Sequence, residues 1–233
     1  DAYKKQMEYC ISLLVNADNA IDVAHAERCP LPFLSCMIDD CLKEGKSVQE
    51  GGAVYNFTGP QGFGIANMAD GLFAIRKLVY EDKKVSMNEL KEALAWNYDK
   101  GLDAQSAGDM TEMIMKAMQK AGRNVDASTA EGLLKTFVGM KPGEQKTQRF
   151  KEIHDMIDEV PKFGNDIPEV DYFAREVAYT YSKPLQNYSN PRGGRFQAGL
   201  YPVSANVPLG GQTGATPDGR YAHTPVADGV SPS

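Results

Sequence analysis

The chain has 233 residues, of which 42% are hydrophobic and 24% charged, and its formal net charge is −6. The length suits one large domain or two small ones, and the composition is ordinary for a globular protein. The negative charge argues against nucleic acid or an anionic membrane as a partner, and no run approaches the roughly 20 apolar residues that span a bilayer.

A long helix is predicted at the beginning of the chain, over residues 3–29. Its apolar side chains recur every three or four positions, as on a helix that packs along one side, and they are Met7, Cys10, Ile11, Leu14, Ala17, Ile21 and Ala24. Pro30 and Pro32 end this helix. The helical pattern already runs at the first residue, which is not methionine, so we expect a piece of a longer chain.

The second predicted helix is short, covers residues 34–43 and ends at Gly45. The four cysteines lie in or near these two helices, and their spacing matches neither a zinc site nor a common iron–sulfur site; they are Cys10, Cys29, Cys36 and Cys41. We expect buried or half-buried free thiols in a reducing cytosol, with a nucleophilic role for one of them as the alternative.

A glycine-rich segment follows over residues 51–64, and a helix is predicted from about Ile65 to Tyr80. The segment lacks the Lys-Ser/Thr pair of a P-loop and the preceding strand of a dinucleotide site. Because it is almost uncharged, we expect a buried loop whose glycines permit close backbone packing.

A capping box of Ser86 and Glu89 predicts a helix from Met87 to about Asn97. The following block, residues 99–160, is predicted to be an inserted helical subdomain. Its expected helices lie near 109–121, 128–138 and 145–159, with Asp109 and Asp126 as N-caps and Gly139 after the second helix.

The end of the chain changes character. Asp166 is predicted to cap a helix over residues 168–188, with Pro168 in its first turn. Residues Tyr201–Val207 then predict one buried strand among glycines, prolines and an Asp-Gly turn. We expect this strand and its loop, within residues 190–233, to lie near a site.

No nucleophile–base pair, metal-ligand cluster or paired carboxylates stand out in the sequence. The residues alone therefore predict a large, mostly helical α/β protein without a defined reaction.

Five segments carry a resemblance to a known family. In chain order they are GGAVYNFTGPQGFGIAN, ADGLFAIRKLVY, KFGNDIPEVD, ANVPLGGQTGATPDGR and VADGVSPS. Together they resemble the glycyl radical enzymes of the pyruvate formate-lyase-like superfamily. The branch that is most similar holds B12-independent glycerol and propane-1,2-diol dehydratases, choline trimethylamine-lyase and isethionate sulfite-lyase. The resemblance covers nearly the whole chain and is weakest over residues 99–160, where an insertion looks most like the propanediol dehydratase type.

The resemblance implies an α/β fold, a ten-stranded barrel surrounded by helices, of which this chain is the mostly helical middle segment. Residues 1–98 would form helical shell and the glycine-rich loop, and residues 99–160 the inserted block. Residues 161–233 would supply a helix, a late barrel strand and the loop that leads toward the glycyl-radical domain.

The resemblance also implies radical chemistry. In the family, an activating enzyme that uses S-adenosylmethionine installs a glycyl radical, which generates a thiyl radical on a cysteine. The cysteine lies in a Gly-Cys-(Val/Ser)-Glu motif and the glycine in an Arg-Val-(Ala/Ser)-Gly-Tyr motif, and neither occurs here. Motif order places the two loops before Asp1 and after Ser233. We therefore assign no catalytic residue, no metal and no bound cofactor to this chain.

The substrate wall is the part of the site that the resemblance leaves in this chain. A tyrosine on the late strand faces the diol in the dehydratases, and Tyr201 matches it. Sulfonate-cleaving relatives place an arginine where this chain has Gln197. On a strand, Gln197, Tyr201 and Val203 share one face, and a neutral face suits an uncharged diol, whereas an arginine suits a sulfonate. Arg192 and Arg195 lie close by and are expected to be surface or salt-bridge arginines.

The implied function is a B12-independent dehydratase that converts propane-1,2-diol or glycerol to an aldehyde and water under anaerobic conditions. The alternatives are a C–N or C–S lyase acting on choline or a sulfonate, and a scaffold segment without catalytic loops. The implied partners are the small-molecule substrate, the activating enzyme and a second copy of the chain in a homodimer. The implied location is the cytoplasm or a bacterial microcompartment.

Overall fold

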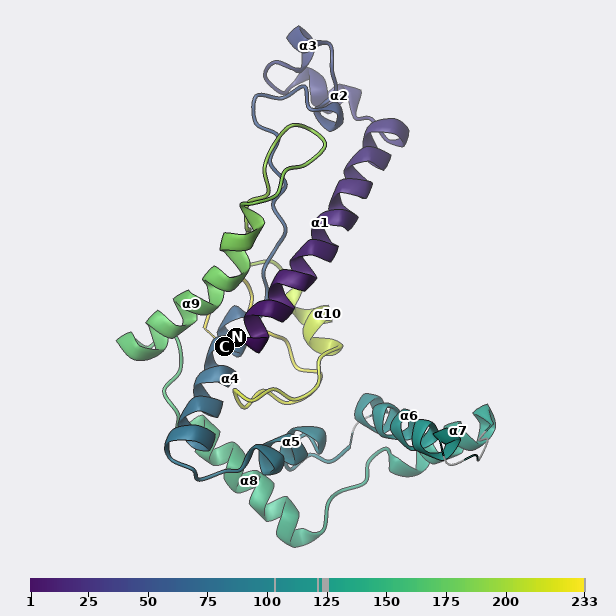
Figure 1. Cartoon of the computed structure of the whole chain (residues 1–233), viewed down its shortest axis with the longest axis vertical. Coiled ribbons are helices and arrows are strands. Elements are labelled where there is room, and N and C mark those ends of the chain that lie inside the picture. Colours follow the sequence, from purple (N-terminus) through teal and green to yellow (C-terminus); the bar gives the residue numbers. More distant parts are fainter. Residues whose placement is uncertain (103, 121, 123–125, 233) are drawn as a thin grey trace. The chain divides into compact units, whose positions relative to one another are not determined.

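The structure is a computed structural model that describes residues 1–102, 104–120, 122 and 126–232 (Figure 1). Within this part the chain is mostly helical, as predicted. It divides into two compact units, Asp1–Phe63 with Arg175–Pro202, and Gly64–Ala174 with Val203–Ser233. The predicted boundaries after residues 98 and 160 stay predictions. Among the described residues, no helix combines the length and the hydropathy that crossing a membrane requires.

The first unit is built on the long predicted helix. Its helices are α1 (Ala2–Arg28), α2 (Pro32–Cys36), α3 (Cys41–Glu44), the 3-10 helix η1 (Val48–Glu50) and the end of α9 (Pro168–Leu185). Two short helices replace the single one predicted over residues 34–43, because Asp40 between them has a left-handed φ of 71°. The predicted end at Gly45 is confirmed, with a φ of 62°.

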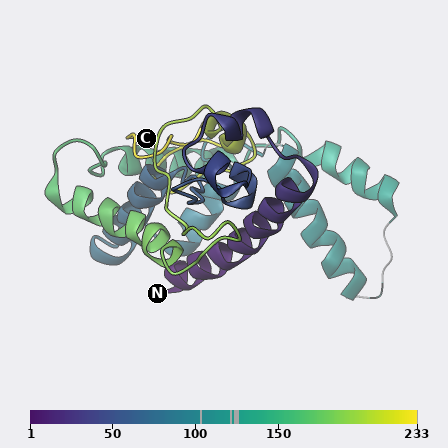
Figure 2. The same ribbon diagram turned by 90° about the horizontal axis from the view of Figure 1, so that it is seen from above.

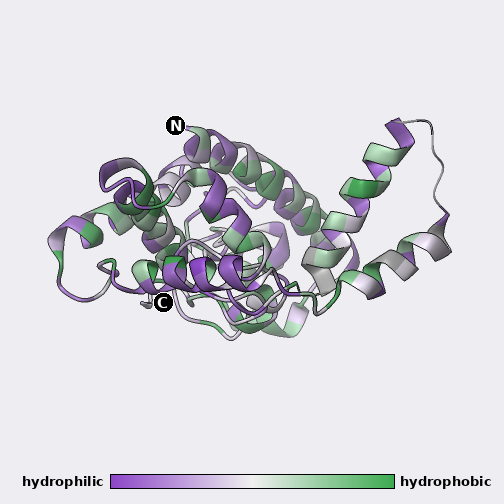
Figure 3. Cartoon of the chain, turned by 90° about the horizontal axis from the view of Figure 1, so that it is seen from below, coloured by the Kyte–Doolittle hydropathy of each residue, from purple (hydrophilic) through white to green (hydrophobic). Residues whose placement is uncertain are grey.

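The core of the first unit lies between the first half of α1 and the end of α9. Its buried residues are Ile11, Val15, Tyr181, Leu185 and Phe196. No described residue of α1 beyond Val15 is buried, and hydrophobic and hydrophilic residues follow each other along the helix (Figure 3). The predicted stripe is confirmed at Ile11 and is wrong at Cys10, Ala17, Ile21 and Ala24, which are exposed. The reason is that the buried apolar core of the unit reaches only the first half of α1; in the second half, Asn19 and Asp22 make polar contacts with Ser189 and Arg192.

The cysteines differ in burial. All four are free thiols; Cys41 is buried, whereas Cys10, Cys29 and Cys36 are exposed. The expectation of burial is therefore wrong for these three. Cys10 lies off the packed face of α1, and α2 buries only Ser35.

The glycine-rich segment is not the buried loop that was predicted. Val54, Tyr55 and Phe57 are 55%, 81% and 54% exposed, because low charge alone does not supply a surface to pack against. The close backbone packing is nevertheless present: a Cβ on Gly52 would lie 2.2 Å from the Lys46 carbonyl oxygen.

The end of the glycine-rich segment pairs with a distant part of the first unit. Isolated parallel bridges join Thr58 to Phe196 and Gln61 to Gly199. The Gln197 N–H donates to the Thr58 carbonyl at 2.8 Å. Parallel pairing between segments so far apart in sequence is typical of α/β architectures.

The strand predicted over Tyr201–Val207 is wrong. The extended backbone lies earlier, around residues 195–199, and α10 (Asn206–Gly211) begins inside the predicted strand. Most backbone bonds of this stretch are local turns, such as Val207 N–H to the Ser204 carbonyl at 3.3 Å, and one distant bond runs from the Val226 N–H to the Asn206 carbonyl at 3.3 Å. A strand needs a neighbouring backbone along its whole length to satisfy its polar groups, and one such bond among the described residues does not supply it.

The second unit is helical throughout its core. Its elements are α4 (Ile65–Ala74), the π-helix η2 (Ile75–Glu81), α5 (Met87–Ala95), α6 (Ala104–Lys120), α7 (Ala127–Phe137), α8 (Glu144–Asp158), the start of α9 and α10. The buried residues of its core are Phe73, Ala74, Leu78, Val85, Leu90, Ala93, Tyr98, Phe150, Ile153, Ile157, Val160 and Val170. The helix predicted from Ile65 is confirmed, and so is the capping box of Ser86 and Glu89.

Helices α6 and α7 pack against each other and stand apart from α4, α5 and α8 (Figure 2). Two backbone hydrogen bonds join the two ends of the segment that contains α6 and α7: Leu102 N–H donates to Met140 O at 3.0 Å, and Gly139 N–H donates to Leu102 O at 2.9 Å. Helix α8, the third helix expected in the block of residues 99–160, buries Phe150 and Ile153 in the core of the unit.

The remaining predicted helix ends are partly confirmed. Asp126 caps α7 by accepting from the Thr129 N–H at 2.7 Å, and Gly139 has the expected positive φ of 79°. Asp109 lies inside α6 and caps nothing, because the helix begins five residues earlier, at Ala104. Helix α9 begins at Pro168, as predicted. Asp166 is wrong as its cap, because Ile167 occupies the position before the helix.

Tyr98 generates a stability prediction, because its side chain is fully buried and its hydroxyl donates to the Thr216 carbonyl at 2.7 Å. We expect Tyr98→Phe to lower the free energy of unfolding by about 1 kcal/mol. Tyr80 is 65% exposed, so Tyr80→Phe serves as the control and should change it by less than about 0.5 kcal/mol. Urea denaturation measures both, and equal effects would contradict the role of the Tyr98 hydroxyl.

Candidate functional site

A buried amide in α4 joins three segments of the second unit. Asn67 is 7% exposed; its Nδ2 donates to Asp218 Oδ2 at 2.6 Å, and its Oδ1 accepts from the Ala227 N–H at 2.7 Å. The Gly64 N–H donates to the Ala227 carbonyl at 2.8 Å. The start of α4 is therefore fixed to two loops that lie 150 residues or more along the chain.

The next turn of α4 and the segment after α8 extend the network. Asp70 is fully buried, and its Oδ1 accepts from the Phe163 N–H at 2.8 Å. Lys162 Nζ donates to the Asp218 carbonyl at 2.6 Å. Burial lowers the pKa of Lys162, while the carboxylates of Asp70 and Asp218 oppose this shift. The segments meet here as two buried carboxylates with a lysine beside them.

Arg220 organises the loop that carries Asp218. Its guanidinium donates to Thr216 Oγ1 at 3.1 Å and to the carbonyls of Tyr221 and Thr224 at 3.0 and 2.7 Å. It also contacts the Gly214 carbonyl. One cation thus gathers the carbonyls of a loop that has no regular secondary structure to satisfy them.

An aromatic cluster holds the tip of the same loop. The rings of His154 and Tyr221 stack with centroids 4.7 Å apart, and Tyr98 meets both edge-on. A ring nitrogen of His154 lies 2.8 Å from the Gly219 carbonyl oxygen. Gly219 has a φ of 100°, and a Cβ there would lie 2.8 Å from Asp158 Oδ1, so the turn requires glycine. Burial, followed by the hydrogen bond to Asp99, raises the pKa of Tyr221 to about 12.

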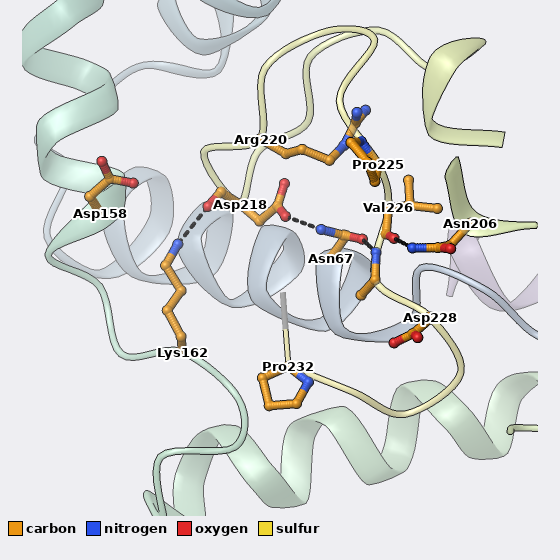
Figure 4. A pocket seen from close by; sticks show the side chains of 11 residues that line it. Asn67, Asp158, Lys162, Asn206, Asp218, Arg220, Pro225, Val226, Asp228 and Pro232 are labelled. Carbon is orange, nitrogen blue, oxygen red and sulfur yellow. Dashed lines mark hydrogen bonds between the residues drawn. The ribbon is translucent and has the colours of Figure 1, made fainter. Parts of the chain in front are cut away.

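A cavity of about 470 Å³ opens beside this network (Figure 4). Its charged and amide side chains are Asn67, Asp158, Lys162, Asn206, Asp218, Arg220 and Asp228. Asp218 Oδ1 is buried without a hydrogen-bond partner among the described residues. No three potential metal ligands gather there or elsewhere in the described part of the chain. The network's buried groups are mostly satisfied by the protein itself, so its primary role is to fix the loops.

The predicted site residues lie elsewhere in the fold. Phe196 is buried, and Ala198 and Leu200 pack against the same core, whereas Gln197 and Tyr201 are exposed, Tyr201 to 59%. This alternation is that of an extended segment with Gln197 and Tyr201 on the face away from the core. Val203 belongs to the second unit and is half-buried. The contact of all three with substrate stays a prediction.

Arg192 was expected to be a surface or salt-bridge arginine, and it forms a salt bridge. Its Nε lies 3.0 Å from Asp22 Oδ2, and its Nη2 donates to Thr58 Oγ1 at 3.1 Å. This arginine is therefore committed to the scaffold of the first unit. Arg195 is exposed.

Sequence reasoning assigned no role to the residues of the buried network, although each lies in a segment that carries the family resemblance. Asn67 and Asp70 lie three residues apart within an otherwise apolar helix, and residues at that spacing share a helix face. Two polar side chains on one face of a buried helix predict buried polar partners. The distant partners, Asp218 and Ala227, show no comparable signal.

The chain is similar to proteins of known family and structure. The pyruvate formate lyase-like family model matches residues 1–210. A solved structure from work on 1,2-propanediol dehydration in Roseburia inulinivorans is 61% identical with a TM-score of 0.93, over 100% of this chain and 28% of that one. The glycerol-bound B12-independent glycerol dehydratase from Clostridium butyricum is 44% identical with a TM-score of 0.73, over 100% of this chain and 23% of that one.

Among curated proteins, the probable dehydratase YbiW of Escherichia coli K12 is 33% identical over 239 residues, covering 100% of this chain and 24% of its own length. The chain thus spans about a quarter of the length of the relatives that it matches.

The Asn67 network predicts a pH-dependent variant. Asn67→Asp keeps the shape but puts two carboxylates in contact, so they share a proton and the pKa of the pair in the folded state rises above its unfolded value. That stabilisation is complete below the unfolded pKa, near pH 4, and is lost as the pH rises through the raised folded pKa. At pH 8 we expect the variant to be about 3 kcal/mol less stable than the parent.

Urea denaturation at pH 5 and pH 8 should show a smaller difference between variant and parent at pH 5. Asn165 lies on the exposed turn, where its side chain donates to the Lys162 carbonyl at 3.2 Å, so Asn165→Asp is the control and should show no such trend. A difference independent of pH would contradict the contact between residue 67 and Asp218.

Proposed function

The chain belongs to the pyruvate formate lyase-like family, and we propose that it is a segment of a B12-independent glycyl radical dehydratase. The substrate in this proposal is a neutral 1,2-diol, propane-1,2-diol or glycerol, and the products are an aldehyde and water. The single observation that carries it is the 61% identity, with a TM-score of 0.93 over the whole chain, to the structure concerned with 1,2-propanediol dehydration.

The parallel pairing supports the barrel in this proposal. Residues 58–61 and 196–199 run parallel, although they are far apart in sequence. In a barrel of parallel strands such neighbours are expected. We propose that residues 195–201 belong to the late barrel strand, with Gln197 and Tyr201 on its inner face.

The two side chains proposed to contact the substrate, Gln197 and Tyr201, suit a neutral molecule. Gln197 carries no charge, and the Tyr201 hydroxyl both donates and accepts hydrogen bonds, as a diol does. Arg192 is bound to Asp22, whereas the exposed Arg195 lies two residues before Gln197, on the same face of an extended segment. A sulfonate would instead favour a guanidinium at position 197 itself.

The radical would be generated by cysteine and glycine loops whose motifs the sequence of this chain lacks. Dehydration then requires removal of a hydrogen from C1, loss of the C2 hydroxyl as water, and return of a hydrogen to the product. The part of this chain is to bind and orient the diol and to exclude solvent. The activating enzyme, a homodimer and a bacterial microcompartment are the further partners and setting that we propose.

The test is anaerobic activation of the full-length protein, followed by electron paramagnetic resonance and by assays for the aldehyde formed from propane-1,2-diol and from glycerol. We expect a glycyl radical signal together with aldehyde. A glycyl radical signal with no aldehyde from either diol would be consistent with membership of the family but would refute the assignment of a diol substrate. Turnover of choline or a sulfonate in its place would establish the lyase alternative.

Within this assay, Tyr201→Phe tests the substrate wall. Loss of the hydroxyl should lower kcat/KM for propane-1,2-diol about tenfold or more, since it removes a hydrogen bond to a substrate hydroxyl. Tyr9 on α1 is also 59% exposed, so Tyr9→Phe is the matched control and should leave kcat/KM unchanged. Equal values for the two variants would refute the assignment of Tyr201.

A further inference from the structure

We propose that Gln61 is a positioning residue, which fixes the Tyr201 side chain by holding the backbone that carries it. The inference rests on the proposed function, because it gives Gln61 a part in the same site. Gln61 Nε2 donates to the Tyr201 carbonyl oxygen at 2.9 Å, across 140 residues of sequence. All the residues involved belong to the first unit.

The side-chain bond continues a backbone pairing. Gly62 N–H donates to the Gly199 carbonyl at 2.9 Å, and Gly199 N–H donates to the Pro60 carbonyl at 2.9 Å. The next bond in the direction of Tyr201 comes from the Gln61 amide. The Gln61 side-chain amide therefore takes the place of a backbone hydrogen bond of the pairing, and it does so at Tyr201, the proposed substrate contact.

Gly199 makes this arrangement feasible. A Cβ at Gly199 would lie 1.9 Å from Gln61 Oε1 and 3.3 Å from Cε1 of the Tyr201 ring. The amide and the ring therefore lie on the same side of the segment, in the space that glycine leaves free. Any larger residue at 199 would displace one of them.

The clamp formed by Gln61 and the Tyr201 carbonyl is anchored to the core of its unit. The Tyr181 hydroxyl, on α9, donates to the Pro60 carbonyl at 2.6 Å. A Cβ at Gly62 would lie 2.9 Å from Leu200 and 3.0 Å from the Tyr181 ring. Residues 60–62 are thus held by the buried Tyr181 and the half-buried Leu200, and this anchoring limits the movement of the segment at Tyr201.

The amide is not placed there for stability alone. Gln61 Oε1 is buried and has no hydrogen-bond partner among the described residues. A buried, unpartnered carbonyl is unfavourable, and an apolar side chain of the same size would avoid it. Tolerance of this unfavourable group is typical of a residue that positions a site.

The test is a double-mutant cycle in the activated full-length protein with propane-1,2-diol as substrate. Gln61→Met fills the space but cannot donate, so we expect kcat/KM to fall about tenfold, with the glycyl radical yield and the melting temperature unchanged. In a Tyr201→Phe background the same change should cost less than about twofold, because Gln61 acts through Tyr201. The proposal would be overturned if the two substitutions lowered kcat/KM independently, so that their fold-changes multiplied in the double variant. It would also be overturned if Gln61→Met had no effect on kcat/KM.

Matched variants separate the clamp from general damage. Gln186 is exposed just after the end of α9, and Gln186→Met should leave kcat/KM unchanged. Gly199→Ala should reproduce the loss of Gln61→Met. Gly59→Ala should not, because its Cβ would meet only the Gln197 carbonyl oxygen, at 3.6 Å.

A crystal structure of the full-length Gln61→Met variant tests the clamp without turnover. A Tyr201 ring displaced from its parental position supports the clamp, and an unmoved ring overturns it. Absence of aldehyde from the parent protein would refute the proposed function alone, because the position of the Tyr201 ring in the crystal does not depend on turnover.

Discussion

The buried amide of Asn67 is the interaction on which the second unit depends. Its donor is used by Asp218 and its acceptor by the Ala227 N–H. An amide buried in α4 without both partners would be unfavourable, and so would the Asp218 carboxylate. Each group is tolerated only because the others are in place. The loops after α10 have few regular backbone bonds, so this network and Arg220 determine their course.

The first unit follows a different principle. Its core is small, and the long helix α1 buries side chains only in its first half, at Ile11 and Val15. The chain gains order from the pairing of residues 58–62 with 195–199, which glycines make close. Together with the many exposed apolar side chains around the glycine-rich segment, this pairing is consistent with a segment of a larger α/β architecture.

The Asn67 network and the face of Gln197 and Tyr201 have different roles in the proposed enzyme. The Asn67 network holds loops by buried charges and amides that are mostly bonded within the protein. The side chains of Gln197 and Tyr201 are exposed instead, on the face away from the core. Polar groups committed to the scaffold cannot bind substrate, and those left outward can. The five segments that resemble the glycyl radical enzymes are therefore explained by structure as much as by chemistry.

The sequence by itself determined the helices with strong local signals, such as α1, the capping box at Ser86 and the cap at Asp126, because these depend on residues within one or two turns. It also determined the family, through five segments whose order and amino-acid sequences are specific. It misplaced the strand at Tyr201–Val207 and misjudged the burial of Cys10 and the glycine-rich segment. Burial and pairing depend on what packs opposite, often more than 100 residues away, and only the tertiary structure decides that. For the same reason, the partners of Asn67 and the bond from Gln61 to Tyr201 emerged only from the fold.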